Sequence, residues 1–116
     1  MKYLMMIYND EAAAATMPRE QMQTMMGEYY AYTKEVQDKG AYIGGNPLHP
    51  TSSATTLRVR DGKALTTDGP FAETKEQLGG YYLLECKDLD EAIDWAAKIP
   101  GAKYGSIEIR PIRVMS

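Results

Sequence analysis

The sequence predicts an α+β fold, with two helices packed on one face of an antiparallel sheet. Two segments have the apolar spacing of helices, residues 17–39 and the segment after Asp88, and each lies between short apolar segments typical of strands. Each half is therefore strand, helix, strand, and a β-hairpin pattern separates the halves. This order is typical of a ferredoxin-like βαββαβ sandwich with an extra β-hairpin.

The first half begins with a strand at residues 3–8, whose two alternating sets of side chains are both apolar. Residues 12–15 are expected to form a loop, after which Thr16 caps a helix over residues 17–39. Gly40 is expected to end that helix. Six of its residues share one helical face and are expected to form part of the core: Met22, Met25, Met26, Tyr29, Thr33 and Val36.

The middle of the chain is rich in strands and turns. A short strand at residues 41–43 is expected to end at Gly44-Gly45, and residues 46–53 are expected to form a loop. Residues 55–60 alternate between apolar and charged side chains, as in a half-exposed strand. Asp61-Gly62 then predicts a two-residue hairpin turn, because both central positions of that turn need positive φ.

The second half begins at Gly79-Gly80, which are expected to lead into a strand at residues 81–86 that is apolar on both faces. Asp88 is expected to cap the second helix. Its apolar stripe comprises five residues: Leu89, Ala92, Ile93, Ala96 and Ile99. The last strand covers residues 106–110, and Pro111, which cannot donate to a ladder, is expected at its end or at an edge of the sheet.

Composition excludes several classes of protein. With 44% apolar and 25% charged residues, the chain is an ordinary globular mixture and is expected to form a single domain over residues 1–116. A net charge of -3 argues against general nucleic-acid binding. One cysteine and one histidine exclude a disulfide framework and leave no expected metal site. We see no signal peptide or membrane span, so we expect a soluble, cytoplasmic protein.

The first strand and the strand at residues 81–86 carry large apolar side chains on both faces, although two helices can cover only one face. Leu4, Met6 and one of Tyr82 or Leu83 would therefore lie on the uncovered side. Each large apolar side chain left exposed forgoes about 1.5–3 kcal/mol of burial. We therefore expect a homodimer in which two sheets pack face to face about a two-fold axis.

Residues 66–82, TTDGPFAETKEQLGGYY, closely resemble the DGPF-containing branch of the YCII-related proteins. The similarity covers nearly the whole chain, through four further segments: KYLMMIYNDE, ATTLRVRDGK, LDEAIDWAAKIP and SIEIRPI. The resemblance implies a dimeric α+β barrel, in which two ferredoxin-like subunits join their sheets around a central space.

The resemblance implies two kinds of function. Fold relatives of the family include cofactor-free monooxygenases and lactone isomerases, and some YCII proteins are thought to use a His–Asp pair with the histidine on or near the first helix. Residues 17–39 contain no histidine, so this chain departs from that pattern. DGPF proteins also resemble companions of extracytoplasmic-function sigma factors, which implies a sensing or regulatory role.

His49 and Asp68 are the candidate catalytic residues. Histidine is the one side-chain type whose ordinary pKa lies near neutrality. His49 would therefore act as a general base, or else it is a solvated loop histidine. Asp68 begins the DGPF tetrapeptide, where it either forms an Asx turn before Gly69-Pro70 or directs its carboxylate at a cleft. If the two side chains meet, the carboxylate would fix the imidazole tautomer.

Four charged residues are the candidate ligand-binding residues: Arg58, Glu73, Lys75 and Arg110. Glu73 and Lys75 lie in a segment that is either a solvated loop or the rim of a ligand site. One possible arrangement places Leu57, Val59, Ile107 and Ile109 toward the helices. Arg58 and Arg110 would then lie on the opposite face, where arginines bind a carboxylate bidentately or form salt bridges.

Two functions follow from these features. The first is binding or conversion of a small polar molecule in a cleft without a cofactor, since no glycine-rich motif has the spacing of a nucleotide site. The second is a regulatory partnership with an extracytoplasmic-function sigma factor. Polar groups that converge on a cavity would favour the first, and an exposed apolar patch away from the dimer interface would favour the second.

Overall fold

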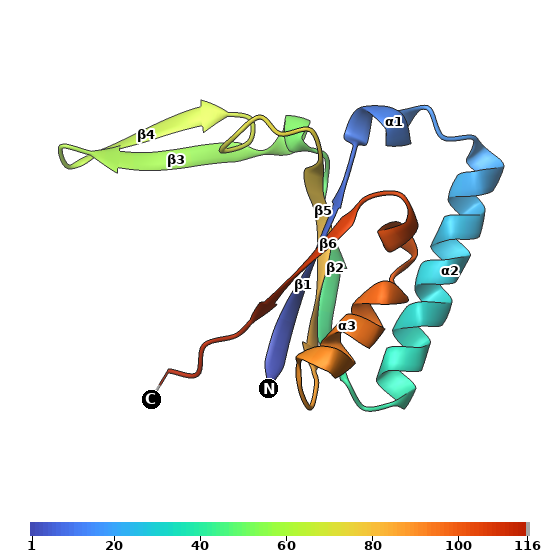
Figure 1. Ribbon diagram of the computed structural model, residues 1–116. Coiled ribbons are helices and arrows are strands. Elements are labelled where there is room, and N and C mark those ends of the chain that lie inside the picture. Colours follow the sequence, from blue (N-terminus) through green and yellow to red (C-terminus); the bar gives the residue numbers. More distant parts are fainter. Residues whose placement is uncertain (116) are drawn as a thin grey trace.

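The computed structural model describes residues 1–115, and its helices lie on one face of a four-stranded sheet (Figure 1). The strands are β1 (Lys2–Asn9), β2 (Tyr42–Pro47), β3 (Thr55–Arg60), β4 (Lys63–Asp68), β5 (Gln77–Glu85) and β6 (Ser106–Pro111). The helices are α1 (Glu11–Ala15), α2 (Arg19–Asp38) and α3 (Leu89–Ala97), with 3₁₀ turns η1 (Thr51–Ser53) and η2 (Pro100–Lys103).

The main sheet has the strand order β2-β5-β1-β6, and each neighbouring pair is antiparallel. This order and the two crossover helices confirm the predicted α+β fold of ferredoxin-like type. The two strands that are apolar on both faces, β1 and β5, occupy the centre of the sheet. β6 is an edge strand that ends at Pro111, as predicted.

Strands β3 and β4 form a separate two-stranded sheet that extends away from the body of the molecule (Figure 1). Asp61 and Gly62 have φ values of 52° and 75°, which confirms the predicted hairpin turn. Leu57 and Val59 are 59% and 58% exposed. The arrangement that places them toward the helices is wrong, because their strand does not pair with the main sheet.

The core lies between the helix-facing side of the sheet, α3 and the C-terminal part of α2. Its largest fully buried side chains are Met5, Leu84, Ile99, Val36 and Cys86, and Ile107 and Ile109 pack against it as predicted. Cys86 is thus a small buried hydrophobic residue. The ring of Tyr32 packs edge-on against Tyr82 at 5.2 Å between centroids and against Trp95 at 6.1 Å.

The long helix is confirmed, but its start differs from the prediction. The expected loop at residues 12–15 is the short helix α1, because alanines favour helix and the Asp10 carboxylate accepts hydrogen bonds from the amides of Ala12 and Ala13. Thr16 ends α1 and does not cap α2, whose N-cap is Pro18.

The expected apolar stripe of α2 is wrong at its N-terminal end. Met22 and Met26 are exposed, whereas Tyr32 and Val36 are buried. Only the C-terminal part of α2 therefore packs closely on the sheet. Two stripe residues of α3, Leu89 and Ile93, are likewise exposed, and the helix buries Ala92 and Ala96.

We expect stability to fall at alkaline pH because of Tyr32. Burial, and then the neighbouring Tyr82, raise the pKa of the Tyr32 hydroxyl well above 10.0. The unfolded tyrosine ionises at about pH 10 and the folded one resists ionisation, so its contribution is complete below about pH 10 and is lost above it. Thermal unfolding between about pH 8 and 11 should show this fall, and Tyr32→Phe should reduce it. Equal falls in both proteins would contradict the assignment.

Candidate functional site

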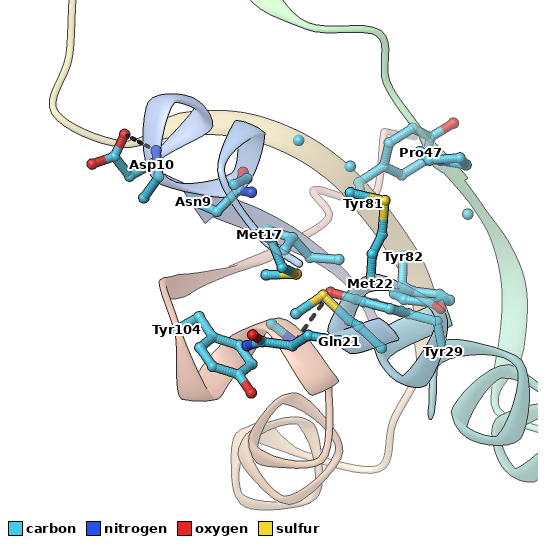
Figure 2. Close-up of a pocket in the computed structure, with 18 of the residues that line it drawn as sticks. Asn9, Asp10, Met17, Gln21, Met22, Tyr29, Pro47, Tyr81, Tyr82 and Tyr104 are labelled. Carbon is cyan, nitrogen blue, oxygen red and sulfur yellow. Dashed lines mark hydrogen bonds between the residues drawn. The ribbon is translucent and has the colours of Figure 1, made fainter. Parts of the chain in front are cut away.

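A cavity of about 780 Å³ lies between the N-terminal part of α2 and the helix-facing side of the sheet (Figure 2), and we refer to it as the α2 cleft. This volume is typical of small-molecule sites. Strands β1, β2 and β5, together with Asp10 after β1, contribute Ile7, Asn9, Asp10, Tyr42, Gly45, Asn46, Pro47, Gly79, Gly80, Tyr81 and Tyr82. The helical side contributes Ala13, Ala14, Thr16, Met17, Pro18, Gln21, Met22, Met25, Tyr29, Thr33, Gly101 and Tyr104.

Two glycines on the helix-facing side of the sheet leave room for the cleft. Gly80 pairs with Ile7 on β1 and with Pro47 on β2, and Gly45 pairs with Tyr82. Opposed residues of antiparallel strands share a face, and Ile7 and Tyr82 are buried against the helices. Gly45 and Gly80 therefore occupy positions where any other residue would project a side chain toward α2.

The structure corrects the two glycine predictions. Gly44-Gly45 do not end the strand, since β2 continues to Pro47, and Gly79-Gly80 lie inside β5. The ring of Tyr82 lies over Gly45, where an added Cβ would be 2.8 Å from the ring carbon Cδ1. Glycine at position 45 is thus needed for this ring position.

Methionines form much of the helical wall of the cleft, namely Met17, Met22 and Met25. Met22 is 44% exposed and Met25 is half-buried, so this apolar surface is only partly covered. Methionine is flexible and polarizable, and its sulfur packs favourably against aromatic rings. The wall therefore suits an apolar or aromatic group of variable shape.

The Tyr29 hydroxyl provides a hydrogen-bond donor on the cleft. Its oxygen accepts the amide hydrogen of Gly101 at 3.1 Å (Figure 2), and within residues 1–115 it donates to no protein group. Burial raises the pKa of the Tyr29 hydroxyl, so it keeps its proton at neutral pH. The bond to Gly101 fixes the oxygen and leaves the proton for a ligand.

A pair of hydroxyls also lines the cleft. The hydroxyls of Thr33 and Tyr82 are 2.7 Å apart, and either can be the donor. Burial raises the pKa of the Tyr82 hydroxyl, with Thr33 acting in the opposite direction through its hydrogen bond. Because two hydroxyls share one hydrogen bond, the pair retains one further proton for a ligand.

Helix α1 closes one end of the cleft and is held in place by two contacts from elsewhere in the chain. The Glu11 carboxylate accepts hydrogen bonds from the Thr51 amide at 2.9 Å and the Thr51 hydroxyl at 2.7 Å. The Glu11 amide donates to the side-chain carbonyl of Gln77 at 3.0 Å. These contacts tie the end of the cleft to η1 and β5.

The described cleft has no positive charge. Its lining contains no lysine, arginine or histidine, and its one carboxylate, that of Asp10, caps α1. The polar groups are the hydroxyls and amides of tyrosine, threonine, asparagine and glutamine. The site is therefore built for neutral hydrogen bonding and apolar contact.

The six predicted site residues lie outside this cleft. His49 is exposed between β2 and η1, and Asp68 is exposed at the end of β4. Among residues 1–115 no hydrogen bond joins His49 to Asp68. In the same residues the Asp68 carboxylate makes none of the hydrogen bonds of an Asx turn. The bend itself is present, with Gly69 at φ 108° and its amide bonded to Ala54.

The four charged candidates are also exposed and are not brought together in one subunit. Glu73 and Lys75 lie in the loop between β4 and β5. The Arg58 guanidinium lies 5.8 Å from the ring centroid of Phe71, a cation–π contact on the projecting hairpin. Arg110 pairs with Leu4 and so lies on the face of the sheet away from the helices, as predicted. Their functional roles stay predictions.

Sequence reasoning missed the cleft residues because it assigned the methionines and Tyr29 to the core. One signal was present in the sequence: two glycine pairs, Gly44-Gly45 and Gly79-Gly80, occur in the two strands β2 and β5, which pair with each other. Methionines and tyrosines that line the cleft lie across from them. Among residues 1–115 no cluster of potential metal ligands occurs, and no helix is long and apolar enough to cross a membrane.

Comparison with known proteins places this geometry in context. The chain is 40% identical over 114 residues to an uncharacterised protein of Rhizobium meliloti (strain 1021), which covers 97% of this chain and 92% of the relative. A solved structure is similar in fold, with a TM-score of 0.50 and 15% identity over 97% of this chain and 94% of that one: the 5-chloro-2-hydroxyhydroquinone dehydrochlorinase TftG of Burkholderia phenoliruptrix AC1100, in complex with 2,5-dihydroxybenzoquinone. The model of the YCII-related domain matches residues 1–116. The chain belongs to the YCII-related family.

Proposed function

We propose that this protein binds, or converts without a cofactor, a small molecule in the α2 cleft. The observation that carries the proposal is a cavity of about 780 Å³ that combines an apolar methionine wall with hydroxyl protons that, within residues 1–115, have no protein acceptor. Such a cavity with a few converging polar groups is the usual form of a ligand site. The dehydrochlorinase of similar fold supports this use of the fold, because its structure contains a small hydroxylated ring compound.

The energetic argument concerns the partly exposed wall. Leaving Met22 and Met25 uncovered forgoes hydrophobic stabilisation, which a ligand seated between α2 and the sheet would restore at about 25 cal/mol per Å² of apolar area. The Tyr29 hydroxyl is held by the Gly101 amide, and the hydroxyls of Thr33 and Tyr82 hold each other. Because these groups are already oriented, little side-chain freedom is lost on ligand binding.

Thermal unfolding in the presence of a metabolite panel tests the cleft. A ligand at one hundred times its dissociation constant should stabilise the wild type by about 2.7 kcal/mol, a shift of several degrees. Ala13→Trp adds an indole to the cleft lining and should reduce that shift, whereas Ala12→Trp, on the same short helix but outside the lining, should keep it. A panel that shifts none of the three proteins, or shifts all equally, would contradict the proposal.

We further propose that the chain is a member of the DGPF branch and forms a homodimer through the face of the sheet opposite the helices. On that face lie Leu4, Met6 and Leu83, each half-buried in one subunit, and both α2 and α3 lie on the other side (Figure 1). Face-to-face packing of two such sheets would bury these side chains and form the barrel of the family resemblance.

Light scattering at micromolar concentration tests the dimer. Met6→Glu places a charge at the centre of this face and should yield a monomer, because an unpaired charge is costly to bury. Met26→Glu, an exposed position on α2 outside the cleft lining, should remain dimeric like the wild type. A monomeric wild type would contradict the dimer.

A second candidate function, partnership with an extracytoplasmic-function sigma factor, is favoured by the projecting hairpin. Leu57 and Val59 lie on one face of it with Ala64, since Val59 pairs with Ala64, and Phe71 beyond β4 is 78% exposed. An isolated two-stranded hairpin is marginally stable, so an apolar partner surface would stabilise it.

Co-expression with a sigma factor of this class tests the second candidate. The wild type should co-purify with it, and Leu57→Glu/Val59→Glu should not, because two charges would replace the apolar contact. Leu65→Glu/Thr67→Glu, at exposed positions on the opposite face of the hairpin, would control for added charge alone, since Leu65 pairs with Arg58 and Thr67 with Thr56. Equal recovery of all three proteins would contradict a role for this apolar face.

A further inference from the structure

We infer that the ligand of the α2 cleft is an uncharged aromatic molecule that carries a hydrogen-bond acceptor such as a ketone carbonyl. The inference rests on the proposed function and specifies its ligand class. Three properties of the lining carry it: its charge, its free donors and its apolar surface.

The charge of the lining excludes anions. The described cleft offers no lysine, arginine or histidine, and the carboxylate at its edge belongs to Asp10. A carboxylate or phosphate buried there would lose its hydration without meeting a cation, which costs several kcal/mol. The candidate cations Arg58, Lys75 and Arg110 lie elsewhere on the surface.

The free donors select an acceptor. Tyr29 has used its oxygen on the Gly101 amide at 3.1 Å and has its proton available. Its pKa is raised by burial, so it donates at neutral pH and does not become a phenolate. A ligand carbonyl would pair with this proton, whereas a ligand without an acceptor would leave it unpaired in a less hydrated site.

The apolar surface favours an aromatic ring. Met17, Met22 and Met25 line the helical side of the cleft. The sheet side presents Gly80, which has no side chain, and the Tyr82 ring that lies over Gly45. Thioether sulfurs pack favourably against an aromatic ring, a contact that an aliphatic ligand does not provide. A flat ring also passes closest to a backbone without side chains.

Four matched probes separate these properties: 2-acetylnaphthalene, 2-naphthoate, 2-ethylnaphthalene and 2-acetyldecalin. They supply in turn a neutral aromatic ketone, an anion of similar shape, an aromatic without an acceptor, and a ketone without an aromatic ring. Titration of the wild-type protein near pH 7.5 should give the tightest binding for 2-acetylnaphthalene. We expect each of the other three to bind at least about threefold more weakly, with 2-naphthoate weakest.

Two pairs of variants locate the contacts. Tyr29→Phe should weaken the binding of 2-acetylnaphthalene about three- to tenfold and leave the binding of 2-ethylnaphthalene unchanged. Tyr30→Phe, at an exposed neighbouring position, should change the affinity for neither compound. Gln21→Lys adds a cation to the lining and should strengthen the binding of 2-naphthoate about tenfold. Gln23→Lys, exposed on the same helix outside the lining, should not. The lysine variants carry the test even if Tyr29→Phe fails to fold.

The outcomes distinguish the inference from the proposed function. If 2-naphthoate binds the wild type as tightly as the ketone, or if Tyr29→Phe has no effect, the ligand class is wrong while the cleft remains a binding site. If a metabolite of another class binds the cleft and none of the four probes does, the ligand class is likewise overturned. If neither the probes nor the metabolite panel binds, the proposed function fails with it.

Discussion

The absence of side chains at Gly45 and Gly80 is the constraint on which the cleft depends. Both lie on the helix-facing side of neighbouring strands, at the end of the sheet beneath the start of α2. Toward the other end of the same face Tyr3 and Leu84 pair with each other, fill the equivalent space and are buried. One continuous sheet face therefore supports a packed core at one end and a hollow at the other.

Helix α2 divides in the same way. Val36 and Tyr32 bury its C-terminal part, and Tyr32 also donates to the carbonyl of Trp95 at 2.9 Å, which ties α2 to α3. The N-terminal part, with Met22, lies over the cleft and has few buried contacts. Segments with few buried contacts open more readily than the core.

Much of the fold could be predicted from the sequence, because the spacing of apolar residues along a helix or strand reflects which of its faces is buried. The long helix is present over Arg19–Asp38, inside the predicted 17–39, as are the turn at Asp61-Gly62 and the two-faced central strands. The cleft could not be predicted, because a methionine stripe has the same pattern whether it faces a core or a hollow. The DGPF segment drew attention to Asp68, although its side chain lies exposed and away from the cavity. Gly45 and Gly80 could be placed on the helix-facing side of the sheet only once the pairing register of β2 and β5 was known.

Glycine amide resonances give the most direct test that the α2 cleft is the ligand site, because glycines line it and also occur far from it. In a ¹H–¹⁵N spectrum titrated with a compound that stabilises the protein, the amides of the cleft glycines should shift: Gly45, Gly79, Gly80 and Gly101. Gly40, which follows α2, and Gly62, at the tip of the hairpin, should remain in place. Shifts confined to Gly62 and Gly69, with the cleft glycines unchanged, would place binding on the hairpin and contradict the cleft as the functional site.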